Sequence, residues 1–149
     1  MKLLALDVGD RRVGVAVCDE LGLTVTPLTT IRRASRAEDF ERIARLVREH
    51  DARGIVVGHP LNRDGSAGTQ ARRVERYAAA LCAALQAAGT PLAVTLWDEY
   101  LSTVQAQEVL AGSGRRSRAR RAGLDAVAAA VILQEYLDAE MGHDEEVSF

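Results

Sequence analysis

The chain has 149 residues, of which 48% are hydrophobic and 27% charged, with a formal net charge of −2. This length is typical of one domain and is enough to bury a core without disulfides or structural metals. Cys18 and Cys82 lack the spacing of a metal-binding pair, and we interpret both as buried thiols in a reducing compartment. No apolar run approaches the ~20 residues of a membrane span and no secretory leader is recognisable, so we expect a cytoplasmic protein without membrane contact.

The charges are unevenly distributed along the chain. All 19 basic residues precede position 122, and 18 of them are Arg, whose planar fork suits phosphate. A GC-rich genome would also enrich Arg, but it would not cluster it. Residues 135–149 carry six acidic and no basic residues. We therefore expect one domain over residues 1–140, followed at 141–149 by an acidic tail with a composition typical of disorder.

The first thirty residues predict three strands. Residues 2–7 form an apolar run typical of a buried strand, and residues 12–18 alternate in polarity as a second strand paired through a tight turn. Residues 23–30 are rich in β-branched side chains. Pro27 cannot donate to a central ladder, so this third strand is predicted at a sheet edge.

Helices and strands alternate after that point. Ser35 and Glu38 form a capping-box pattern that predicts a helix over residues 36–50. A short apolar strand is expected at 54–58, and an amphipathic helix at about 68–88.

The last third predicts a strand at 91–97 and two further helices. Ser102 and Gln105 repeat the capping-box pattern and would open a short helix that ends near residue 111. The final helix is expected over about 122–140. The order βββαβαβαα predicts an α/β fold with a mixed five-stranded sheet, three antiparallel strands followed by two parallel ones, and helices on both faces. Sites in such sheets form outside the carboxyl ends of the parallel strands.

Acidic residues occur where this topology would place a site. Asp7 ends the first strand, Asp98 and Glu99 end the last strand, and Asp125 lies at the start of the final helix. Small alanines around Asp125 would let that helix approach the sheet closely. Alone, each acid also fits a turn, a cap or a helix-dipole role. Together they predict a cluster of carboxylates at one edge of the sheet.

Carboxylates at short range raise one another's pKa, and a divalent cation relieves that conflict. Oxygen ligands without His or Cys suit Mg²⁺ or Mn²⁺. Two such ions ~4 Å apart can activate water and stabilise the leaving oxygen of a phosphodiester. We expect Gly9 and Gly14 to leave room for the substrate beside Asp7.

Four segments resemble the YqgF/RuvX family of RNase H-like nucleases. They are LALDVGDRRVGVAV, IVVGHPLNRDGSAG, DEYLSTVQA and GLDAVAAAVILQEYLD, and they run in order from residue 4 to residue 138. The resemblance implies an RNase H-like fold and a Mg²⁺- or Mn²⁺-dependent endonuclease. Its substrate would be structured RNA, cut during 5′-end processing of pre-16S rRNA, or branched DNA, cut during Holliday junction resolution. Resolving a junction takes two coordinated cuts, so that substrate would imply a two-fold homodimer.

The family's carboxylates fall on Asp7, on the Asp98–Glu99 pair and on Asp125. We favour Asp7, Glu99 and Asp125 as the metal ligands and include Asp98 among the catalytic candidates. The chain departs from the family pattern at two positions. Tyr100 stands where the family has an Arg, which removes a phosphate contact. His59 stands where the family has a Leu; it could shuttle a proton near neutral pH, but we favour a plain polar surface role.

Arginines lie on both sides of the predicted acid cluster. The glycine-flanked segment 112–123 directly precedes Asp125, and further arginines follow Asp7 or flank the helix at 68–88. Such groups can hold a phosphate backbone, although a solvated charge run is the commoner explanation. The predicted nucleic-acid-binding residues are Arg11, Arg12, Arg63, Arg115, Arg116, Arg118, Arg120 and Arg121, with Arg72, Arg73 and Arg76 nearby.

Two other function classes fit parts of the sequence. An actin-like or sugar-kinase-like ATPase shares the Asp-x-Gly hairpin but needs two lobes around its nucleotide. A non-catalytic nucleic-acid-binding or ribosome-assembly factor is favoured by the missing Arg at position 100.

Overall fold

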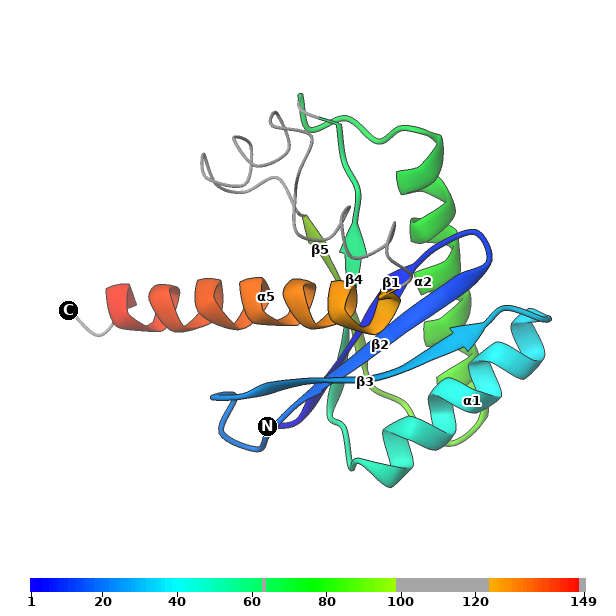
Figure 1. The fold of residues 1–149 in the computed structure, drawn as a ribbon, viewed down its shortest axis with the longest axis horizontal. Helices are drawn as coiled ribbons and strands as arrows, with labels where there is room; N and C mark the ends of the chain where they lie inside the picture. Colours follow the sequence, from blue (N-terminus) through cyan, green and yellow to red (C-terminus); the bar gives the residue numbers. More distant parts are fainter. Residues whose placement is uncertain (63, 99–123, 148–149) are drawn as a thin grey trace.

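The computed structural model describes residues 1–62, 64–98 and 124–147. These residues form a single five-stranded sheet with the strand order β3-β2-β1-β4-β5 (Figure 1). The first three strands are antiparallel neighbours, whereas β4 is parallel to β1 and β5 is parallel to β4. The strands are β1 (Leu3–Val8), β2 (Arg12–Cys18), β3 (Val25–Arg32), β4 (Gly54–His59) and β5 (Ala93–Asp98). The predicted α/β architecture is confirmed, including the edge position of the strand that contains Pro27.

Helices cover both faces of the sheet. Helices α1 (Arg36–Glu49) and α2 (Thr69–Ala87) lie on one face, and α5 (Asp125–Val147) crosses the other (Figure 1). The final helix was expected to end near residue 140 but continues to Val147. The short helix predicted after Ser102 falls outside the described residues. No helix in the described ranges is both long and apolar enough to span a membrane.

An apolar layer covers each of the two faces of β1. Leu4, Leu6 and Val8 belong to the layer under α1 and α2, whereas Leu3 and Ala5 belong to the layer under α5. Successive side chains of a strand point to opposite faces. Asp7 therefore points to the face that α5 covers.

The predicted helix signals match the structure. The Ser35 hydroxyl accepts a hydrogen bond of 3.2 Å from the backbone N–H of Glu38 at the start of α1. The inner stripe of α2 is fully buried and consists of Val74, Tyr77, Leu81 and Leu85. A local side-chain cap thus predicts the start of α1, and helical spacing predicts the buried face of α2.

The two cysteines differ in their surroundings. Cys18 is buried at the end of β2, where its sulfur accepts a hydrogen bond of 3.2 Å from the Leu3 N–H. Cys82 is exposed on α2, so the prediction that both thiols are buried is wrong for this residue. Its position on the outer side of the helix stripe explains the exposure.

The substitution Leu133→Ala tests how strongly α5 is anchored to the sheet. Leu133 is completely buried in the layer under α5. Removing its side chain should lower the free energy of unfolding by about 2–5 kcal/mol. Val127→Ala on the same helix is the matched control, because Val127 is 38% exposed. We expect that control to change stability by no more than about 0.5 kcal/mol. Urea denaturation measures both, and equal losses would contradict this account of α5.

Candidate active site

Asp7 lies near the carboxyl end of β1 and is 1% exposed. Its partner in the antiparallel ladder is Gly14 of β2. Because β1 is the central strand of the sheet, this carboxylate is surrounded by protein on both sides of the strand. A buried acid at a strand end is costly unless charge or hydrogen bonds compensate it.

Gly14 is the contact point between the sheet and α5. A Cβ atom at this position would lie 1.9 Å from the carbonyl oxygen of Asp125 and 2.3 Å from its carbonyl carbon. No side chain can fit there unless the helix moves. The first residue of α5 therefore rests on the ladder partner of Asp7, so Asp7 and Asp125 come from neighbouring points on the same face of the sheet.

This contact corrects one prediction. We expected Gly9 and Gly14 to leave room for a substrate. The space at Gly14 is filled by the backbone of Asp125, and a Cβ on Gly9 would lie 3.0 Å from the carbonyl oxygen of Arg12 in the β1–β2 turn. The prediction is therefore wrong for Gly14, which serves close packing, whereas Gly9 also borders an open cavity that reaches Asp125.

Asp125 is buried next to one positive charge. The Arg12 Nε atom lies 3.1 Å from the Asp125 Oδ2 atom, and the Asp125 side chain is 9% exposed. Although this is ion-pair distance, Oδ2 is buried and accepts no well-aligned hydrogen bond within the described residues. The start of α5 adds a partial positive charge at the same place. The Asp125 carboxylate thus has one cation at ion-pair distance and an Oδ2 lone pair that no hydrogen-bond donor among the described residues occupies.

An oxygen with a free lone pair and an oxygen-only donor set fits Mg²⁺ or Mn²⁺. In the part of the chain that the structure describes, no group of three or more His, Cys, Asp or Glu side chains could hold a metal ion. The predicted ligand Glu99 lies outside that part. Asp7, Glu99 and Asp125 as a set of metal ligands therefore stay a prediction.

Asp98 lies at the same edge of the sheet but on the other face. It is level with His59 in the β4–β5 ladder, as Val94 is with Ile55. Both Val94 and Ile55 pack in the layer under α1 and α2, and Trp97 packs under α5. Strand alternation therefore directs Asp98 away from the face of Asp7.

His59 is partly covered by α2. Its side chain is 14% exposed, and its Nε2 atom lies 3.1 Å from Glu75 Oε2. The interpretation of His59 as a plain surface residue is wrong. Like Asp98, it belongs to the α2 face, so it does not lie on the side of the sheet that carries Asp7.

Arginines line the approach to Asp125. Arg11 and Arg12 border a cavity of about 350 Å³ that also reaches Asp10, Gln70 and Asp125. A neighbouring hollow of about 320 Å³ is lined by the same two arginines and Arg32. The other predicted nucleic-acid-binding residues, Arg63 and the five arginines of segment 115–121, fall outside the described residues.

Sequence reasoning missed Asp10 and Gln70 as neighbours of this cavity. Asp10 could have been found, because it lies in the turn that follows Asp7. Gln70 comes from the first turn of α2, and no local pattern relates that turn to the acid cluster.

The mixed sheet with helices on both faces is an RNase H-like fold. The structure of T. thermophilus RuvC in complex with a Holliday junction substrate is similar, with a TM-score of 0.57 over 95% of this chain and 96% of that one. The sequences are 17% identical, so this likeness establishes the shared fold.

Sequence comparison defines the family. The model of the family described as "RuvX: Holliday junction resolvase" matches residues 1–139, and the chain belongs to this family. A protein of Syntrophus aciditrophicus named "Putative pre-16S rRNA nuclease" is 50% identical over 139 residues, which cover 93% of this chain and 89% of that protein. A protein of the same name from Thermoanaerobacter pseudethanolicus is 42% identical over 141 residues, covering 94% and 98%.

Gly14→Ala tests the contact between β2 and α5. The added methyl group must displace the Asp125 backbone, which we expect to destabilise the fold by about 1–3 kcal/mol. The change should also alter the near-ultraviolet circular dichroism of Trp97, because its ring meets Tyr136 of α5 edge-on at 5.5 Å. Thr30→Ala is the control, since Thr30 is the exposed ladder neighbour of Gly14 on β3. An unchanged spectrum and stability for Gly14→Ala would show that α5 does not depend on this contact.

Proposed function

We propose that the protein is a Mg²⁺- or Mn²⁺-dependent endonuclease that hydrolyses phosphodiester bonds in structured nucleic acid. The observation that carries this proposal is the packing of the Asp125 backbone on Gly14. This contact holds buried Asp125 at the ladder partner of buried Asp7. The family and the names of its relatives support the same reaction class.

Asp7 and Asp125 would hold the cation together with Glu99. We prefer Glu99 to Asp98 because Asp98 falls on the α2 face and not on the face of Asp7. When bound, such a cation supplies Lewis acidity that activates water and stabilises the leaving oxygen.

The protein's own groups orient the substrate. Arg12 is 51% exposed, so its guanidinium can reach both Asp125 and a phosphate oxygen in the adjoining cavity. Arg11 lines the same cavity and would contact the phosphate backbone of the nucleic-acid strand. Such contacts position a nucleic acid without reading its sequence.

Between the two substrate classes we favour the 5′ end of pre-16S rRNA. Relatives at 42–50% identity carry that name, whereas the likeness to RuvC concerns the fold. A ribosomal RNA precursor would place the reaction in the cytoplasm. Holliday junction DNA is the second candidate, favoured by the description of the family, and it would require a homodimer.

A non-catalytic assembly factor is the competing function, and Tyr100 is the feature that favours it. Purified protein with Mn²⁺ should cleave a labelled 16S rRNA precursor faster than a four-way DNA junction. Faster cleavage of the junction would reverse the substrate assignment. Tight binding of the precursor with no cleavage of either substrate would support the assembly factor.

Asp7→Asn tests the catalytic assignment. It should reduce the cleavage rate by at least about 10²–10³-fold, the usual effect of removing one preorganised electrostatic group. Substrate affinity should hardly change, because arginines supply the binding. Asp98→Asn is the matched control at the same sheet edge, and we expect it to retain most of the activity. Full activity of Asp7→Asn would exclude the proposed site.

A further inference from the structure

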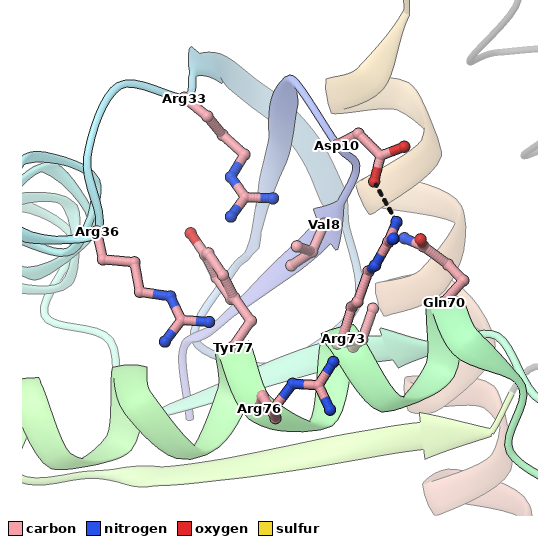
Figure 2. A pocket seen from close by; sticks show the side chains of 9 residues that line it. Val8, Asp10, Arg33, Arg36, Gln70, Arg73, Arg76 and Tyr77 are labelled. Atoms are coloured by element: carbon pink, nitrogen blue, oxygen red, sulfur yellow. Dashed lines mark ion pairs between the residues drawn. The ribbon is translucent and has the colours of Figure 1, made fainter.

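A second cavity lies on the opposite face of the sheet from α5. It has a volume of about 230 Å³ and is formed by the end of β1, the start of α1 and the first turns of α2 (Figure 2). We call it the arginine pocket, and we define it by Arg33, Arg36, Arg73, Arg76 and Tyr77. Neither the paired acids nor the proposed reaction uses these residues.

The arginine pocket carries excess positive charge. Its lining contains four guanidinium groups and one carboxylate, that of Asp10, which lies 3.6 Å from Arg73. Arg33 is held in place, since it donates a hydrogen bond of 2.8 Å to the Gly9 carbonyl and lies 4.0 Å from buried Asp39. Arg36 and Arg76 are exposed and form no ion pair with any described residue. Two of the four charges are thus free to meet an anion.

Tyr77 adds a donor that has no acceptor. The residue is 1% exposed, and its hydroxyl is buried without a hydrogen-bond partner within the described ranges. Arg33 lies over its ring at 5.1 Å, and the hydroxyl points to the side of the pocket where Arg33 lies (Figure 2). Burial, with a smaller effect of Asp39, raises the pKa of Tyr77 to about 12, so the hydroxyl keeps its proton. Buried donors without partners are rare and call for an explanation.

We infer that the arginine pocket binds one backbone phosphate of the nucleic-acid substrate, away from the bond that is cut. This inference rests on the proposed nuclease function. A phosphate offers several acceptor oxygens to the guanidinium forks and to the Tyr77 hydroxyl. Phosphodiester fits better than a free nucleotide, because the aromatic ring here is buried and offers no face on which a base could stack.

The position of the arginine pocket favours a polymer. Asp10 and Gln70 line both this pocket and the cavity that reaches Asp125. One strand can therefore occupy both cavities across the edge of the sheet. The hydrogen bond from Arg33 to Gly9 also connects the pocket to the turn that follows Asp7. Phosphate bound here would hold that turn and set the distance between the two contacts.

The test compares two double variants of equal charge. Arg36→Gln/Arg76→Gln removes the two unpaired charges of the pocket. Arg42→Gln/Arg48→Gln also removes two exposed charges, and Arg48 lies about 18 Å along α1 from Arg36. Binding of a labelled 16S rRNA precursor is measured by fluorescence anisotropy in EDTA, at salt concentrations from about 50 to 200 mM. In this range the affinity of a protein that contacts phosphates falls steeply with salt.

The pocket variant should bind about tenfold more weakly, as expected for lost hydrogen bonds to a charged group. Its plot of log affinity against log salt should be shallower by about 0.7–0.9, the contribution of one phosphate. Tyr77→Phe should also weaken binding while leaving the urea midpoint unchanged. Equal affinities and slopes for the pocket and control double variants would overturn the inference.

Two further measurements separate this inference from the proposed function. Cleavage with Mn²⁺ is recorded for the wild type. If the wild type binds the precursor without cutting it, the nuclease proposal is wrong. In that case a shallower salt slope for the pocket variant than for the wild type would still support the phosphate site. Inorganic phosphate is titrated against the Arg36 and Arg76 side-chain signals by NMR. Inorganic phosphate could shift these signals while RNA binding does not depend on the arginine pocket. That result would assign the pocket to a free phosphate compound and overturn the contact with the nucleic-acid backbone.

Discussion

The site depends on one close contact, that of the α5 backbone with Gly14. An L-amino acid with a side chain at position 14 would push the helix off the sheet, because its Cβ would meet the Asp125 carbonyl at 1.9 Å. The contact places a helix N-terminus, a buried carboxylate and the Arg12 guanidinium at one point. The positive end of the helix dipole and the Arg12 guanidinium both lie beside the Asp125 carboxylate. The absence of a side chain at position 14 thus lets α5 rest on the sheet at the ladder partner of Asp7.

The central strand divides the chemistry of the molecule between two faces. Asp7 points toward α5, and its neighbour Val8 points toward the arginine pocket. His59 and Glu75 also lie on the second face. Both faces end at the same edge of the sheet, where Asp10 and Gln70 border cavities on either side. A polyanion that crosses this edge would contact the cavity that reaches Asp125 on one side and the arginine pocket on the other.

Most of the fold was predictable because its signals are local. An apolar run marked β1, alternation marked β2, Pro27 marked the edge strand, and the Ser35 cap marked the start of α1. The sequence also indicated that Asp7 and Asp125 would converge. It could not reveal that Gly14 seats a helix, that α2 covers His59, or that Arg33 and Arg76 share a cavity. Each of these depends on which elements become neighbours, and no short segment contains that information.

The order of the elements also affects when the site can form. Asp7 belongs to the first strand, and Asp125 to the last helix that the structure describes. The sheet can pair up to β5 while α5 has yet to leave the ribosome, since no strand lies beyond it in the described ranges. A nascent chain at that stage carries arginine-rich surfaces without the second acid. The pair of buried acids therefore cannot assemble until the start of α5 has been synthesised and has docked on Gly14.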